Sequence, residues 1–175
     1  MKKETILVPA RITREIFRRF AYFDAFYHQK HWQSPLAFAL LMSAFSVPCF
    51  LLRDRREGAV LLGVVLLIVG LGLPLAYLLS FSLSLRRQMK RMDLSGERIA
   101  YTLRLELGGV HVTAGTETAD YPWETVHMAY RVSGCDYLYV SAGRAYLLPH
   151  GPSAENIWTL LQSALPPEKL KQMKF

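Results

Sequence analysis

Cysteine is scarce in this sequence, and glycine and proline are not enriched. The 175 residues include two cysteines, Cys49 and Cys135, and neither has a second cysteine or a histidine at a metal-ligand spacing. We therefore interpret both as unpaired thiols in a reducing compartment. Eleven glycines and nine prolines, with apolar residues gathered in long blocks, exclude collagen-like, mucin-like and fully disordered chains.

Charged residues are missing from two long stretches. Positions 36–52 and 59–85 contain no Asp, Glu, Lys or Arg. A helix of about 20 apolar residues crosses the ~30 Å hydrocarbon core of a bilayer, and both stretches reach this length once the first recruits the residues from Trp32 onward. The sequence therefore predicts a transmembrane hairpin of two helices over residues 35–85.

Proline and small residues add detail to this hairpin. Pro74 lies inside the second stretch and predicts a kink near Gly70 and Gly72, because proline has no N–H to donate. Small residues recur at four-residue spacing in both stretches: Ala39 and Ser43, then Ala59 and Gly63. This spacing favours close packing within the hairpin, with a homo-oligomer as the alternative.

The distribution of Lys and Arg predicts the orientation of the hairpin. The net charge is +4 over residues 1–34, +1 over 53–57, +3 over 86–94 and −1 over 95–175. Because basic residues accumulate on the cytoplasmic side, we expect a multi-pass protein of the inner or plasma membrane with both termini in the cytoplasm. An interfacial tryptophan and a basic cluster are predicted to anchor the hairpin: Trp32, Arg86, Arg87, Lys90 and Arg91.

The segment before the first span has the pattern of an amphipathic helix lying in the headgroup region. Between Ile12 and Trp32, aromatic and apolar residues recur at three- and four-residue intervals. Asp24, His28 and His31 share one face of this helix and offer a carboxylate and two imidazoles to a divalent metal. We interpret them instead as polar residues of the interface and predict no metal and no cofactor.

From residue 95 the pattern changes to alternation with turn signals. Short runs of period two are separated by Gly-containing turns, which is typical of a meandering antiparallel sheet, and a final helix begins after Ser153 and stops at Pro166. We predict an α+β module over 95–175, a half-barrel of the pleckstrin-homology-like type closed by its C-terminal helix. The module is expected to fold without the membrane, and residues 5–8 offer it an additional strand.

These features divide the chain into four predicted parts. Residues 1–34 contain an N-terminal strand and the interfacial helix, 35–85 the transmembrane hairpin, 86–94 a basic juxtamembrane linker, and 95–175 the cytoplasmic module. The predicted core of the module combines aromatic and aliphatic residues from its strands and helix: Trp123, Tyr137, Tyr139, Leu147, Ile157, Leu160 and Leu161.

Four short motifs carry a resemblance to a known family. They are Tyr-Pro-Trp-Glu-Thr-Val at 121–126, Tyr-Leu-Tyr-Val at 137–140, Tyr-Leu-Leu-Pro at 146–149 and Leu-Pro-Pro-Glu-Lys at 165–169. In this order, after two adjacent spans, they resemble the YcxB-like family of bacterial membrane proteins. The resemblance covers nearly the whole chain and implies two spans with a C-terminal pleckstrin-homology-like module, and no established catalytic activity.

No arrangement of side chains in the sequence indicates catalysis. The serines lack the context of a nucleophile elbow, and Gly108-Gly109 is too short for a phosphate-binding loop, so we predict that the protein is not an enzyme. Trp123 is interpreted as a core residue, with a binding aromatic as the alternative. Arg131 and Arg144 are interpreted as solvated turn charges, with an anion site as the alternative.

Three functions then remain for a membrane-anchored module that does not catalyse a reaction. It is either a cytoplasmic platform that binds a protein or senses a signal, a module that recognises anionic lipid, or an accessory subunit of a larger membrane complex. The net charge of −1 over 95–175 disfavours lipid recognition and nucleic-acid binding, both of which use a concentrated basic surface. We therefore expect two kinds of partner, the lipid bilayer and a protein.

Overall fold

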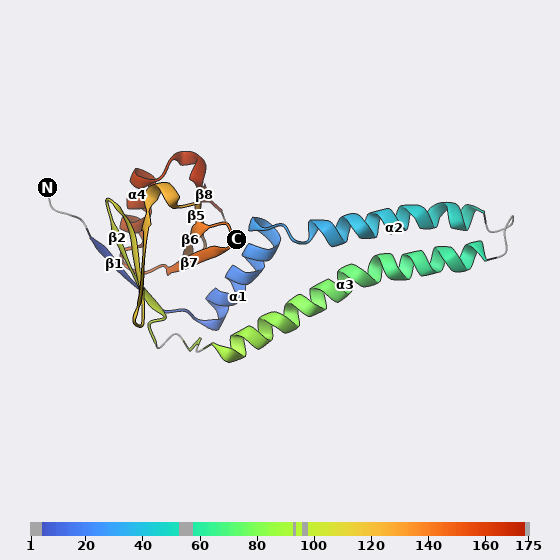
Figure 1. Cartoon of the computed structure of the whole chain (residues 1–175), viewed down its shortest axis with the longest axis horizontal. Coiled ribbons are helices and arrows are strands. Elements are labelled where there is room, and N and C mark those ends of the chain that lie inside the picture. Colours follow the sequence, from blue (N-terminus) through green and yellow to red (C-terminus); the bar gives the residue numbers. More distant parts are fainter. Residues whose placement is uncertain (1–4, 53–57, 93, 96–97, 174–175) are drawn as a thin grey trace. The chain divides into compact units, whose positions relative to one another are not determined.

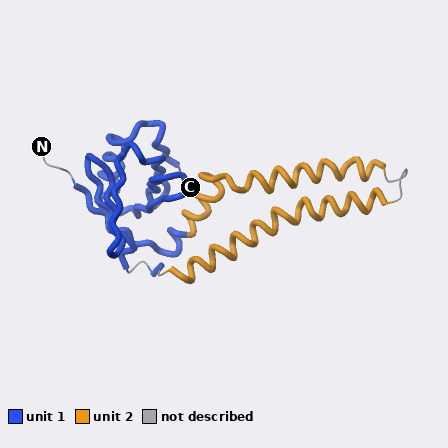
Figure 2. Tube along the Cα trace, viewed as in Figure 1, with its two compact units in different colours: residues 1–17, 93–175 blue, residues 18–92 orange. Residues whose placement is uncertain are grey.

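The computed structural model describes residues 5–52, 58–92, 94–95 and 98–173. The chain divides into two compact units, one formed by Met1–Phe17 with Asp93–Phe175 and the other by Arg18–Met92 (Figure 2). The first unit is built mainly of strands and the second of helices. The helical unit is therefore an insertion between two sequence segments that fold together.

The sheet unit contains two four-stranded sheets (Figure 1). The first has the order β1-β2-β3-β4 and is antiparallel throughout, with strands β1 (Ile6–Ala10), β2 (Tyr101–Glu106), β3 (Gly109–Ala114) and β4 (Glu117–Pro122). The second has the order β7-β6-β5-β8, with strands β5 (Met128–Val132), β6 (Cys135–Ser141), β7 (Arg144–Pro149) and β8 (Leu170–Gln172). Strand β8 pairs with β5 in parallel, which the sequence pattern did not predict.

Two short helices and one longer helix complete the sheet unit. The 3₁₀ helix η2 (Trp123–Thr125) connects the two sheets, helix α4 spans Ala154–Ala164, and the 3₁₀ helix η3 spans Pro167–Lys169. Pro122 ends β4, and the next residues form η2 before β5 begins at Met128. Pro122 cannot donate to a sheet ladder, which explains the break.

One hydrophobic core joins both sheets and α4. Alternate residues of the strands point into it, as Leu103 and Leu105 do from β2, and both are fully buried. Helix α4 contributes Ile157, Leu160 and Leu161 from one face. All seven residues predicted for the core are buried, and Trp123 is 6% exposed, so its interpretation as a core residue is confirmed.

Strand β1 belongs to this core although a long insertion follows it. It pairs with β2 from Ile6 opposite Leu105 to Ala10 opposite Tyr101, and Val8 and Ala10 are buried. An isolated antiparallel β-bridge between Thr13 and Ser95 keeps the two chain segments adjacent beyond the β1–β2 ladder. The optional strand predicted at 5–8 is thus present at Ile6–Ala10, and the compact sheet unit begins earlier than the predicted boundary at residue 95.

The helical unit contains α2 (Gln33–Leu51) and α3 (Ala59–Arg91), preceded by α1 (Arg14–Phe23) and a π-helical turn, η1 (Asp24–His28). The amphipathic helix predicted over 12–32 is therefore shorter and ends in a π turn, and Lys30 then takes a left-handed φ of 51°. Helices α2 and α3 lie side by side (Figure 1). The predicted loop 53–57 lies outside the described residues.

Small residues set the spacing of α2 and α3, but not all at the predicted positions. A Cβ built on Gly70 would lie 2.8 Å from Cβ of Met42, and one on Gly63 would lie 3.1 Å from the ring of Phe50. Ala39 and Ser46 on α2 are buried, whereas the predicted Ser43 is half-buried. Close packing within the hairpin is therefore present and centres on Gly63 and Gly70.

Both long helices have the length and apolar composition of membrane spans. Within the most apolar stretch of each, 11% of the residues are buried, and large side chains such as Leu40, Leu61 and Ile68 are about two-thirds exposed. A core helix of a soluble protein buries such side chains. The exposed apolar surface of these helices fits a hydrocarbon environment.

Candidate functional site

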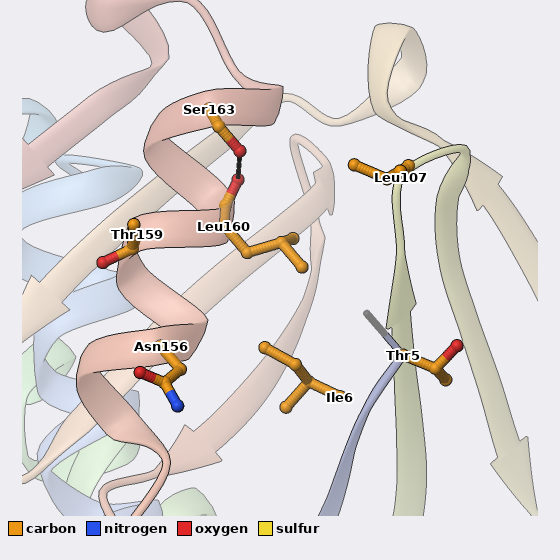
Figure 3. Close-up of a pocket in the computed structure, with 7 residues that line it drawn as sticks. All are labelled: Thr5, Ile6, Leu107, Asn156, Thr159, Leu160 and Ser163. Atoms are coloured by element: carbon orange, nitrogen blue, oxygen red, sulfur yellow. Dashed lines mark hydrogen bonds between the residues drawn. The ribbon is translucent and has the colours of Figure 1, made fainter. Parts of the chain in front are cut away.

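The sheet unit has a groove between α4 and the neighbouring end of the first sheet. Its volume is about 430 Å³, and its walls come from the start of β1, the β2–β3 turn and one face of α4 (Figure 3). Seven residues line it: Thr5, Ile6, Leu107, Asn156, Thr159, Leu160 and Ser163.

The helix wall of this groove follows from the spacing of α4. Asn156, Thr159 and Ser163 are separated by three and four residues, so they lie on one face of the helix, and all three are exposed. The hydroxyl of Thr159 donates to the carbonyl of Glu155 at 2.9 Å, and that of Ser163 to the carbonyl of Leu160 at 2.8 Å. The Asn156 amide has no hydrogen-bond partner within the described residues, so it can both donate to and accept from a ligand.

The floor of the groove is apolar. Ile6, Leu107 and Leu160 project into the space between α4 and the strands (Figure 3). Leu107 is 68% exposed because it lies in the tight β2–β3 turn, whereas Leu160 is 8% exposed. Among the described residues, the lining holds no Asp, Glu, Lys or Arg. The groove therefore offers apolar contact with hydroxyl and amide groups beside it.

A second group of polar side chains surrounds a buried carboxyl on β6. The Asp136 side chain is 2% exposed, and its Oδ1 pairs with Nε2 of His150 at 2.8 Å and lies 3.9 Å from Nε of Arg131. Its Oδ2 is buried without a partner among the described residues. Burial raises the pKa of Asp136, although the hydrogen bond from His150 and the charges of His150 and Arg131 oppose this.

Arg131 extends this group to α4. Its guanidinium forms two hydrogen bonds to the Glu155 carboxylate, at 3.0 and 2.5 Å, and lies over the ring of Trp158 at 5.4 Å. The side chain is 13% exposed. The interpretation of Arg131 as a solvated turn charge is therefore wrong, because it lies in β5 and ties that strand to α4. Arg144 lies over the ring of Tyr146 at 5.5 Å.

The adjacent Cys135 is an unreactive thiol. It is buried, and burial together with the charge of Asp136 raises its pKa to about 12. A thiol must ionise to act as a nucleophile or metal ligand, so Cys135 stays protonated at neutral pH. No group of three or more His, Cys, Asp or Glu side chains that would hold a metal occurs in the described part of the chain.

The residues predicted to anchor the protein lie at the ends of the long helices. Trp32 immediately precedes α2, is 39% exposed and donates from Nε1 to the carbonyl of Phe26 at 2.9 Å. The four basic side chains are exposed on the last turns of α3: Arg86, Arg87, Lys90 and Arg91.

The metal alternative finds no support in the geometry of the interfacial helix. Oδ2 of Asp24 accepts a hydrogen bond from Nε2 of Gln29 at 2.7 Å, and Oε1 of the same Gln29 contacts Nε2 of His31 at 2.5 Å. The π turn at Asp24–His28 changes the helical spacing that placed the three side chains on one face.

Sequence reasoning found neither the groove nor the Asp136 group, although both leave a signal. A carboxylate in the otherwise apolar run of β6 indicates a buried charge that needs partners. Three small polar residues on one face of α4 leave that face without bulky side chains. The sequence does not show that β1 lies opposite α4, where its first residues form the other wall of the groove.

Comparison with known proteins adds no relative, since no family model, curated protein or solved structure matches the chain.

Proposed function

We propose that this chain is a membrane-anchored protein that does not catalyse a reaction and that uses its cytoplasmic sheet unit to bind a segment of another protein. The proposal includes a pleckstrin-homology-like arrangement of the kind expected for the YcxB-like family. In the sheet unit, the order β1 to β4, then β5 to β7 and then α4 is consistent with such a half-barrel, with the hairpin inserted between β1 and β2.

The exposed apolar surfaces of α2 and α3 support the membrane location. A water-soluble monomer rarely exposes contiguous apolar patches beyond a few hundred Å². Here large aliphatic side chains are exposed from Leu36 to Leu51 in α2 and from Val60 to Leu83 in α3. Trp32 at the start of α2 and the basic cluster at the end of α3 match the anchors that flank membrane spans.

The pairing of β1 with β2 supports the proposed topology. These strands precede and follow the hairpin in the chain, and a continuous ladder of hydrogen bonds requires them to be on the same side of a membrane. Two crossings, by α2 and then α3, return the chain to its starting side. The basic excess of residues 1–34 and 86–94 supports the cytoplasm as that side.

The uncharged groove beside α4 is the observation that favours a protein segment as the ligand. Apolar side chains give contact area, and the Asn156 amide can pair with a peptide group. An anionic lipid headgroup is normally bound by Lys or Arg in or beside its site. The described residues that line this groove include neither, and Leu107 and Asn156 directly follow the acidic Glu106 and Glu155. Lipid recognition by the sheet unit is therefore less well supported than protein binding.

Site-specific photocrosslinking in native membranes tests the groove. A photoreactive residue at Leu107 should crosslink one defined protein, and the same residue at the exposed Thr118 of β4 should not. Thr159→Arg places a long charged side chain in the groove and should abolish the crosslink. Gln162→Arg, on the same helix but outside the lining, should leave it intact. Equal crosslinking from positions 107 and 118 would overturn the proposal.

A further inference from the structure

One face of α3 changes its packing partner along the length of the helix. At Gly63 and Gly70 this face meets α2, where an added Cβ would lie 3.1 Å from Phe50 and 2.8 Å from Met42. Further along, the ring of Phe81 packs edge-on against Tyr22 at 5.4 Å and Phe26 at 5.7 Å, between ring centroids. The first half of α3 is therefore covered by α2 and the later part by the aromatic residues of α1 and η1.

A groove of about 600 Å³ lies between these two packed regions. Leu73 and Tyr77 precede Phe81 by eight and four residues and thus share its face of α3. Six residues line the groove: His31, Ser34, Pro35, Phe38, Leu73 and Tyr77. This face of α3 is packed against α2 before the groove and against Tyr22 and Phe26 after it. The groove itself is open and lies at the depth of the proposed membrane, where another molecule can fill it.

The lining changes from polar to apolar with depth. Along α2 the chain enters the proposed membrane from His31 towards Phe38, and α3 runs in the opposite direction, so Tyr77 is shallow and Leu73 is deep. The imidazole, hydroxyl and phenol groups are therefore at the headgroup end, beside the interfacial Trp32. Phe38 and Leu73 are at the hydrocarbon end. This order matches the polarity of a phospholipid.

The charges at the shallow end favour an acidic headgroup. No carboxylate is among the described residues that line the groove, and the exposed Lys30 immediately precedes His31. The nearby Asp24 carboxylate accepts the amide of Gln29. A lysine and an imidazole at the interface attract a phosphate group.

We propose that the groove between α2 and α3 binds one acidic phospholipid from the cytoplasmic leaflet. Its phosphate lies at His31, Ser34 and Tyr77, and one acyl chain lies along Phe38 and Leu73. The proposal rests on the membrane location proposed above and concerns a different surface from the groove beside α4.

Native mass spectrometry of the full chain in mild detergent tests this site. After exchange with mixed vesicles of phosphatidylglycerol and phosphatidylcholine, we expect one retained phosphatidylglycerol per chain. Leu73→Trp fills the groove and should remove the retained lipid. Leu75→Trp is the matched control at the same depth, because Leu75 is two residues away on the opposite side of α3 and 60% exposed. It should retain the lipid.

A second variant separates loss of the site from loss of the fold. His31→Ala removes a polar contact without adding bulk, and it should reduce the preference for phosphatidylglycerol over phosphatidylcholine. Equal retention by Leu73→Trp and wild type, or no retention by wild type, would overturn the proposal. Release of the chain by alkaline extraction of membranes would instead contradict the membrane location itself.

Discussion

Trp123 lies where the chain passes from one sheet to the other, and it contributes both apolar area and a hydrogen bond. Its ring belongs to the common core, and Nε1 donates to the carbonyl of Glu106 at 2.9 Å. A smaller side chain at this position leaves a cavity, and it also leaves the partly buried Glu106 carbonyl without its donor. The two contributions can be separated by substitution.

Trp123→Ala should lower the free energy of unfolding by about 3–5 kcal/mol, because it removes a buried aromatic ring and the hydrogen bond. Trp123→Phe keeps most of the apolar area and should cost clearly less. Thermal or denaturant unfolding of the detergent-solubilised chain, followed by near-ultraviolet circular dichroism, measures both values. An unchanged stability of Trp123→Ala would return this residue to the role of a surface aromatic.

The raised pKa of Asp136 leads to a prediction of how the free energy of unfolding depends on pH. Because burial raises its pKa in the folded chain, the folded state binds more protons than the unfolded state between the ordinary carboxyl pKa and the raised value. Within that interval this group makes the free energy of unfolding fall as pH rises. Above it, the buried carboxylate remains a constant cost.

Asp136→Asn should remove this part of the pH dependence, so its stability relative to wild type should increase as pH rises through the interval. Midpoints of thermal unfolding between pH 4 and 7 measure the effect. Glu117→Gln is the control, since Glu117 is an exposed carboxylate at the start of β4. Parallel curves for wild type and Asp136→Asn would contradict the assignment.

The packing of helix α2 against helix α3 depends more on Gly70 than on the nearby Gly72. A Cβ on Gly70 would meet Cβ of Met42 at 2.8 Å, whereas a Cβ on Gly72 would have no atom within 4 Å. Both glycines lie in the same helix, Gly70 four residues and Gly72 two residues before Pro74.

Gly70→Ala should destabilise the hairpin by about 1–3 kcal/mol, the usual effect of overpacking. Gly72→Ala should be neutral or slightly stabilising, because alanine favours helix over glycine by roughly 0.5–1 kcal/mol. The midpoint of thermal unfolding in mild detergent, read from the helical circular dichroism signal, compares them. Equal effects of the two substitutions would show that Gly70 has no special role in the contact.

Strand β1 is the element that a fragment of the C-terminal part lacks. A chain of residues 93–175 leaves the edge of β2 unpaired and loses Val8 and Ala10 from the core. Because Thr13 and Ser95 are bridged, residues 1–17 can be joined to 93–175 through a short Gly/Ser linker. The joined chain should unfold cooperatively and at a higher temperature than 93–175 alone.

Addition of a peptide with the sequence of residues 5–13 should partly restore the stability of the 93–175 fragment. Nuclear magnetic resonance spectra of the fragment, with and without the peptide, provide the measurement. If the fragment alone matched the joined chain in stability, β1 would be dispensable and the predicted boundary at residue 95 would be adequate.

The sequence predicted elements that depend on local pattern and missed those that depend on distant partners. The two charge-free stretches correspond to α2 and α3, and the alternating runs correspond to strands, because both patterns follow from burial or exposure of neighbouring residues. The pairing of β8 with β5, the binding partners of Arg131 and the groove beside α4 all join segments far apart in the chain. Periodicity holds no information about such pairs.

For the molecule as a whole, the insertion of the hairpin between β1 and β2 makes orientation a testable property. An Arg55→Cys substitution should react with an impermeant thiol reagent in intact cells, and Ser95→Cys should react only after permeabilisation. Both variants are made with Cys49→Ala, because the native Cys49 is only half-buried and lies in the last turn of α2. The native Cys135 adds little background, because it is buried and its pKa is about 12. Labelling of position 95 in intact cells would reverse the topology.

The ladder between β1 and β2 also constrains the order of events during synthesis. About 90 residues separate Ala10 from Tyr101, so at roughly 5–20 residues per second β1 waits on the order of 5–20 s for its partner. Throughout this delay residues 6–10 lack their partner β2, and an unpaired strand is a site for aggregation. Delivery of the hairpin to the insertion machinery must therefore precede completion of the sheet. A ribosome stalled before β2 should carry an inserted hairpin with a protease-sensitive N-terminus.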